Sequence, residues 1–193
     1  MTPLALQDLK NLHEYELERP DFRRRVIELK KRRRVPLGPL LTLVFENRDT
    51  MRFQVQEMIR IERIVRPDKV QEELDVYNAL LPGPGEVAAT LFIEVTEREK
   101  IQSTLDGFLG LDEPGRLVLK IGETSIPARF AAGQSREDRI SAVHYIRFAL
   151  GPGERDALSR GEPAALEVRH GEYHARSPLP AETREELVRD LSS

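Results

Sequence analysis

Three glutamates in the first third of the chain, Glu46, Glu57 and Glu62, could perform acid–base chemistry. Glu46 closes an alternating segment, LTLVFE, that predicts a strand over residues 41–46. Glu57 and Glu62 fall inside the wide apolar arc of a helix predicted from about Met51. A carboxylate withdrawn from water needs a partner, a metal ion or a raised pKa. We therefore treat all three as candidate catalytic residues.

Four arginines are the candidate ligand-binding residues that would accompany these glutamates. Arginine forks hold carboxylate or phosphate groups in two-point contacts, and a desolvated glutamate nearby could act as a base. The four are Arg48, Arg52, Arg136 and Arg139. In the alternative interpretation, the glutamates lie at the edge of the apolar arc or form structural ion pairs, because structural networks also perturb carboxylates.

A strongly basic segment covers residues 21–34, DFRRRVIELKKRRR, and predicts a helix that begins at Pro20-Asp21. Residues 1–40 hold ten Lys/Arg against six Asp/Glu, so the net charge of −3 divides into +4 there and −7 elsewhere. The segment could bind an acidic partner, or it could be a solvated face that meets the acidic remainder of the chain. Nucleic acid ranks last, because no aromatic side chains interleave the basic ones. The candidate partner-binding residues are Arg24, Lys31, Arg32, Arg33 and Arg34.

The remaining pattern predicts an α+β fold, in which a helical N-terminal part packs on a mostly antiparallel β-sheet and a C-terminal helix closes the chain. Residues 1–82 are expected to be helix-rich with one strand, and residues 83–193 strand-rich, the two forming one compact domain. Further helices are predicted near residues 4–12, 67–81, 97–105, 152–160 and 180–191. Further strands are predicted near residues 86–95, 116–121, 124–130, 140–150, 165–170 and 173–176.

Composition limits the possible chemistry. The chain has no cysteine, which excludes disulfides, thiolate nucleophiles and cysteine-ligated metal centres, and which fits a reducing compartment. No apolar run approaches the roughly 18 residues of a membrane span, and the N-terminus lacks a signal-peptide core, so a cytoplasmic location is expected. The histidines lack the spacing of a strong metal site, and we predict neither a metal nor a cofactor.

Three long motifs resemble those of an uncharacterised family of bacterial proteins catalogued as a domain of unknown function. They are FENRDTMRFQVQEMIRIER, EELDVYNALLPGPGE and SREDRISAVHYIRF, and the likeness extends nearly end to end. The resemblance implies that the gene for this chain lies beside two others. One encodes a rubrerythrin-like protein, and the other encodes an iron–sulfur oxidoreductase similar to heterodisulfide reductase or glycolate oxidase subunits. It implies no catalytic residue.

The first hypothesis is therefore a non-catalytic accessory protein that binds an iron–sulfur or non-haem-iron redox partner. The second is an enzyme or small-anion-binding protein that uses the Glu/Arg cluster, and the third is nucleic-acid binding through the helix at residues 21–34. The sequence leaves open whether the chain is an enzyme and which oligomeric state it adopts.

Overall fold

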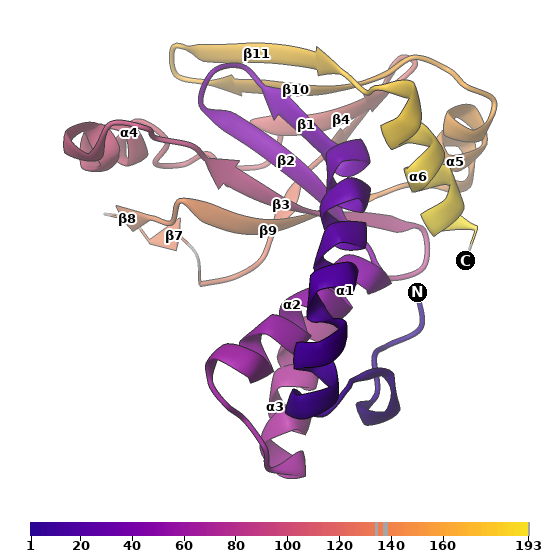
Figure 1. Ribbon diagram of the computed structural model, residues 1–193. Helices are drawn as coiled ribbons and strands as arrows, with labels where there is room; N and C mark the ends of the chain where they lie inside the picture. The colour runs from indigo at the N-terminus through magenta and orange to yellow at the C-terminus, as the bar shows by residue number, and fades with distance from the viewer. Residues whose placement is uncertain (134, 137–138, 193) are drawn as a thin grey trace.

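The chain folds into two stacked antiparallel sheets from which an arm of three helices extends (Figure 1). The computed structural model describes residues 1–133, 135–136 and 139–192. In the described residues every strand pairing is antiparallel, and a C-terminal helix packs beside the sheets. The predicted α+β fold is confirmed.

The first long helix, α1, spans Leu12–Arg33 and follows a short 3₁₀ turn, η1, at Leu6–Asp8. The predicted helix start at Pro20-Asp21 is wrong, because Pro20 lies inside α1. The Asn11 side chain caps the true start by accepting a hydrogen bond from the amide of Glu14 at 3.0 Å. A helix tolerates an internal proline when its packing offsets the lost hydrogen bond, and here Tyr15 and Val26 are buried on either side of it.

A hairpin that the sequence did not predict follows α1. Strand β1, Arg34–Leu37, pairs with β2, Leu41–Glu46, so the first 82 residues contain two strands rather than one. Gly38 makes the turn with φ = +73°, and a Cβ at this position would lie 2.5 Å from the hydroxyl of Tyr173. That hydroxyl donates to the Leu37 carbonyl at 2.7 Å. Glycine therefore permits the positive φ of the turn and leaves space for the hydroxyl of Tyr173.

The arm is completed by α2, Arg48–Ile61, and α3, Pro67–Asn78. Asn47 is the N-cap of α2, and it exchanges hydrogen bonds with Thr50 at 2.9 and 3.0 Å. The helix ends at Ile61, so Glu62, predicted within its apolar arc, follows the helix instead. Seven side chains form the core of the arm: Leu4, Met51, Val55, Ile59, Leu74, Tyr77 and Leu81.

The larger sheet has the strand order β1-β2-β3-β9-β6. Strand β3, Glu86–Ile93, lies in its centre and is buried on both faces, as its continuous apolar sequence predicts. Its neighbours are β2 and β9, Val143–Ala149. Because β2 and β3 pair, strands from both sides of the predicted boundary at residue 82 share one sheet. The division into two parts stays a prediction.

The smaller sheet has the order β11-β10-β4-β5 and contains β4, Leu117–Ile121, β5, Thr124–Pro127, β10, Ala164–His170, and β11, Tyr173–Pro178. The single strand predicted over residues 124–130 is divided. β5 pairs with β4, whereas β6, Arg129–Phe130, pairs with β9 in the larger sheet. The segment therefore crosses from one layer to the other at Ala128.

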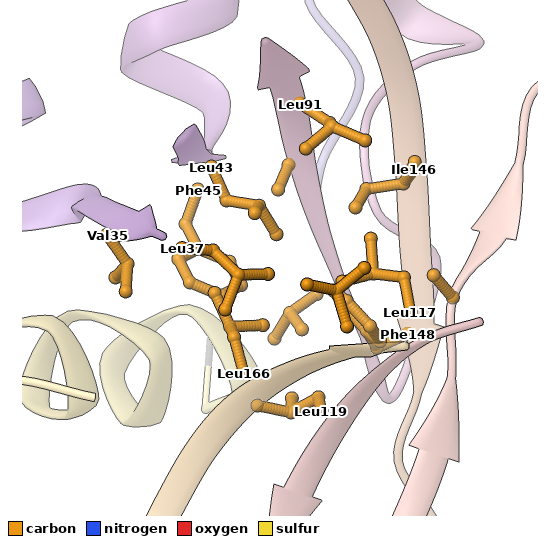
Figure 2. Close-up of a cluster of buried hydrophobic side chains, with 14 of the residues drawn as sticks. Val35, Leu37, Leu43, Phe45, Leu91, Leu117, Leu119, Ile146, Phe148 and Leu166 are labelled. Atoms are coloured by element: carbon orange, nitrogen blue, oxygen red, sulfur yellow. The ribbon is translucent and has the colours of Figure 1, made fainter. Parts of the chain in front are cut away.

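The remaining elements lie around the sheets. They are η2, Arg98–Lys100, α4, Ile101–Asp106, β7, Ser135–Arg136, β8, Arg139–Ile140, α5, Pro152–Ser159, and α6, Ala181–Leu191. The main core fills the space between the two sheets, where Leu43, Phe45 and Ile146 from one layer meet Leu119 and Leu166 from the other (Figure 2). The opposite face of the larger sheet is left for the helices, and the candidate site lies there.

Candidate functional site

The site begins with the alternation of side chains along β2, β3 and β9. Because Phe45 enters the main core, its neighbour Glu46 points to the helical face of the sheet. The register places Ala88 opposite Glu46, and Arg147 opposite Ala88. One row further along, Thr90 pairs with Tyr145. One carboxyl group, two hydroxyls and one guanidinium thus share a face of three adjacent strands.

Glu46 is buried, with 2% of its surface exposed, yet its carboxyl group is only half satisfied. Its Oε1 accepts a hydrogen bond from the Thr90 hydroxyl at 2.7 Å and lies 3.9 Å from the Lys30 ammonium. Its Oε2 is also buried and accepts no hydrogen bond within the described part of the chain. An unmatched buried acceptor costs about 1–3 kcal/mol, so this oxygen favours a hydrogen-bond donor.

A cavity of about 290 Å³ adjoins Glu46 between the sheet and the start of the arm. Met51 from α2 and Leu80 after α3 form part of its wall, together with Ala88, Phe130 and Ile146 from the strands. Tyr145 also lines the cavity. Burial raises the pKa of the Tyr145 hydroxyl, and the charge of Glu46 adds to this effect, so the phenol keeps its proton at neutral pH.

Two arginines and a second glutamate form the opposite side of the cavity. Glu86 accepts a hydrogen bond from Arg129 at 2.5 Å and lies 3.7 Å from Arg147. The amide of Gly83 donates to the same carboxylate at 3.0 Å. Arg147 also donates to the Ala79 carbonyl, which ties it to the segment after α3. Both guanidinium groups are therefore held in place at the cavity wall.

Glu57, in contrast, is fully paired. Its carboxylate accepts hydrogen bonds from Arg19 Nε at 2.7 Å and Nη2 at 2.8 Å, and from the Tyr15 hydroxyl at 2.7 Å. Arg19 lowers the pKa of Glu57, burial opposes this, and the Tyr15 hydroxyl lowers it further. A carboxylate with a lowered pKa is a weak base. The contacts join α1 to α2, as the structural alternative predicted.

Glu62 lies apart from both other glutamates. It follows the last residue of α2 and is exposed to solvent. The structure therefore separates the three predicted catalytic residues into a cavity, an interhelical ion pair and an exposed helix end. Of these three glutamates, only Glu46 is buried and has a side-chain oxygen that accepts no hydrogen bond within the described residues.

Two of the four predicted ligand-binding arginines, Arg48 and Arg52, pair with groups other than these glutamates. Arg48 binds Asp8 at 2.6 Å and the carbonyl of Thr2 at 3.2 Å. Arg52 pairs with Asp49 at 3.3 Å and its guanidinium carbon lies 5.0 Å from the ring centre of Phe22. Arg136 and Arg139 are opposite each other in the β7–β8 pair, but their side chains are outside the described residues.

The basic segment is largely neutralised by neighbouring acids. Arg33 is 1% exposed and binds Glu186 at 2.9 Å and Asp190 at 2.7 Å, which joins α1 to α6. Arg32 also contacts Glu186, at 3.2 Å. Burial removes Arg33 from any partner's reach.

The other three candidate partner-binding residues form pairs at the surface. Lys31 binds Glu28 at 2.6 Å, Arg34 binds Glu94 at 3.1 Å, and Arg24 binds Asp21. Exposed pairs of this kind are weak and exchange readily with a partner's charges. Lys31, Arg34 and Arg24 therefore remain accessible.

Sequence reasoning missed the polar residues that accompany Glu46 at the site: Glu86, Thr90, Arg129, Tyr145 and Arg147. The spacing in HYIRF does place Tyr145 and Arg147 on one strand face, which is a usable signal. Their approach to Glu46 depends on the register of three strands, which no local pattern specifies.

Two negative observations concern possible metals and membranes. Among the described residues, no group of three or more His, Asp or Glu side chains is arranged to hold a metal ion. None of the helices in the same residues combines the length and apolar character needed to cross a bilayer.

Comparison with known proteins gives a family and a structural relative. The family described as "Protein of unknown function (DUF3501)" matches residues 3–191. The crystal structure of a novel protein of unknown function from Burkholderia pseudomallei K96243 is 32% identical, covers 98% of this chain and 100% of its own, and superposes with a TM-score of 0.92. A comparison with curated proteins finds no match.

Proposed function

Because the chain belongs to DUF3501, a family of proteins of unknown function, we propose a function from its own site: it binds a small polar molecule in the cavity beside Glu46. The observation that carries this proposal is the buried Oε2 of Glu46, which accepts no hydrogen bond within the described residues. An unmatched acceptor does not stabilise the fold, whereas it stabilises a bound ligand that donates a hydrogen bond to it.

The cavity has further properties of a binding site. Ligand sites are mostly apolar hollows with a few well-placed polar groups, and their volumes run from about 300 Å³ upward. At about 290 Å³ this cavity is at the lower end of that range and suits a small molecule. The contacts of Glu86 with Arg129 and Arg147 fix the charged groups before a ligand arrives, which lowers the entropic cost of binding.

Native mass spectrometry of the protein purified from its own host tests the proposal. We expect a small molecule bound at one per chain, lost in Glu46→Gln and retained in Glu123→Gln, which makes the same chemical change in an exposed turn. Circular dichroism would confirm that both variants fold. A ligand retained by Glu46→Gln, or wild-type protein that carries no small molecule and is not stabilised by any member of a metabolite library, would refute the proposal.

The second candidate is the accessory role, in which the chain binds an iron–sulfur or rubrerythrin-like protein in the cytoplasm. The observation in its favour is an apolar groove on the arm, of about 310 Å³, bordered by Leu6, Ile64 and Val65. Val65 is 74% exposed, and Ile61, the last residue of α2, is 64% exposed. Exposed apolar side chains grouped in this way are typical of protein-binding surfaces.

Mixing this protein with a purified heterodisulfide-reductase-like or rubrerythrin-like protein of the same host tests the accessory role. The double variant Ile61→Ser, Val65→Ser should abolish co-elution on size-exclusion chromatography. Val76→Ser, on α3 and 59% exposed, is the matched control and should preserve it. If neither partner co-elutes with wild-type protein, the accessory role is refuted for these partners.

A further inference from the structure

We propose that the molecule bound in the cavity is a short carboxylate that carries an amino or hydroxyl group. This inference rests on the function proposed above and names the chemical class of its ligand. Four observations lead to it: a hydrogen-bond acceptor at one side, an excess of positive charge at the other, the separation between them, and apolar walls.

The acceptor side is formed by Glu46. The Thr90 hydroxyl already donates to Oε1, and Oε2 is the buried atom that accepts nothing within the described residues. A ligand group placed here must donate a hydrogen bond, which an amine or a hydroxyl does. A carboxylate cannot, because an ionised carboxylate only accepts. The ligand's anionic group must therefore lie elsewhere.

The positive side is formed by Arg129 and Arg147. Both guanidinium groups share a single carboxylate, that of Glu86, and each has five N–H donors. Among the described residues that line the cavity or pair with its lining, counting Lys30 beside Glu46, three are cations and two are carboxylates, a formal excess of one positive charge. The carboxylate of such a ligand matches the planar fork of arginine, and a hydroxy acid, whose net charge is −1, also restores neutrality.

The length of the ligand is limited by the size of the cavity. Glu46 and Arg147 are in the same row and separated only by Ala88, so their Cα atoms are two strand spacings, or about 9–10 Å, apart. Both residues line a cavity of about 290 Å³, which is at the lower end of the volumes of ligand sites. A compound in which two or three carbons carry both groups is small enough for this space.

The walls between the two sides are apolar. Met51, Leu80, Ala88, Ala89 and Ile146 line the cavity together with the charged groups already named. These side chains suit a short aliphatic chain rather than a sugar or nucleotide, which would need hydrogen bonds along its whole length.

Isothermal titration calorimetry with a matched three-carbon series tests the ligand class. The probes are β-alanine, 3-hydroxypropanoate, propanoate and propylamine, which share a chain and differ only at its ends. We expect β-alanine or 3-hydroxypropanoate to bind at least about tenfold more tightly than the two probes that lack one group, which is the usual effect of one charge-assisted hydrogen bond. The longer 6-aminohexanoate should bind more weakly.

Two variants assign the binding to the two sides of the cavity. Glu46→Gln should remove the preference for the donor-bearing probes over propanoate. Arg129→Gln should weaken every carboxylate, and it should fold normally because the Arg129 side chain is 60% exposed. Glu123→Gln and Arg98→Gln make the same changes at exposed positions away from the cavity and should bind like wild type.

The outcomes distinguish this inference from the proposed function. Propanoate or propylamine binding as tightly as the bifunctional probes, and losing affinity in the cavity variants, would overturn the ligand class but keep the cavity as a binding site. A bound compound of another class, found by native mass spectrometry, would also overturn the ligand class and keep the cavity as a binding site. If no probe binds and no compound accompanies the purified protein, both the class and the site are refuted.

Discussion

Glu46 and Glu57 are eleven positions apart and are both withdrawn from solvent, but they accept different numbers of hydrogen bonds. Glu57 receives three hydrogen bonds from Arg19 and Tyr15, and both of its oxygens are matched. Glu46 is more deeply buried and receives one hydrogen bond from Thr90, with a second oxygen unmatched in the described residues. The more buried carboxyl group is the less satisfied one.

Under the function proposed above, this difference separates a structural carboxylate from a ligand-binding one. A group whose partners all come from the chain stabilises the contact between two elements, here α1 and α2. A group left partly unmatched beside a cavity contributes little to folding and keeps its binding capacity for another molecule. Burial alone does not distinguish the two kinds of carboxylate. The number of hydrogen-bond partners that each carboxylate has within the chain does.

The largest expected effect comes from removing a partner at the most deeply buried ion pair. Arg33→Met would leave Glu186 and Asp190 without the guanidinium that joins α1 to α6. Breaking a buried pair by removing one partner costs about 3–5 kcal/mol. We expect that loss in the free energy of unfolding, measured with urea, whereas Arg24→Met at an exposed pair should change it by less than about 0.5 kcal/mol. Equal effects would contradict the structural role of pairing.

A smaller loss is expected at Glu57. Glu57→Gln removes the charge that Arg19 and the buried Tyr15 hydroxyl recognise, and hydrogen bonds to charged groups are worth about 1.5–3 kcal/mol. Because glutamine keeps one acceptor, we expect the free energy of unfolding to fall by about 1–2 kcal/mol. If Glu57→Gln has the stability of the wild type, Glu57 contributes no more than Glu46 to the free energy of unfolding, and the predicted contrast is wrong.

The Glu57 contribution should also depend on pH. Arg19 lowers the pKa of Glu57 below its ordinary value of 4.5, so the folded state binds its proton less readily than the unfolded state. The stabilisation is complete above pH 4.5 and is lost as pH falls through the folded-state pKa. The stability difference between wild type and Glu57→Gln should therefore shrink between pH 5 and pH 3. A constant difference would show that Arg19 does not act through the charge.

The smallest stability effect is expected at Glu46. In Glu46→Gln the amide oxygen can still accept from the Thr90 hydroxyl, and the lost Lys30 contact is 3.9 Å long. We expect the free energy of unfolding to change by less than about 1 kcal/mol, in either direction. A loss as large as that of Glu57→Gln would assign Glu46 to folding and remove the contrast between the two sites.

Local patterns predicted most elements because each element carries its own signal. The alternation in LTLVFE and the continuous apolar run of β3 predicted both strands, and the proline-led final helix was also predicted. The patterns failed where tertiary contacts override local preference. Pro20 lies inside α1, and the segment 34–37, expected only to end a helix, forms β1 by pairing with β2.

What the sequence determined by itself is the α+β class, the absence of cysteine chemistry and the unusual position of glutamates among apolar residues. Only the tertiary structure decided which glutamate is paired. Arg19 reaches Glu57 because α1 begins before Pro20 and packs on α2, and Arg147 shares a row with Glu46 because three strands align in one register. Such partners are distant along the chain, and their encounter depends on how whole elements pack rather than on the residues beside them.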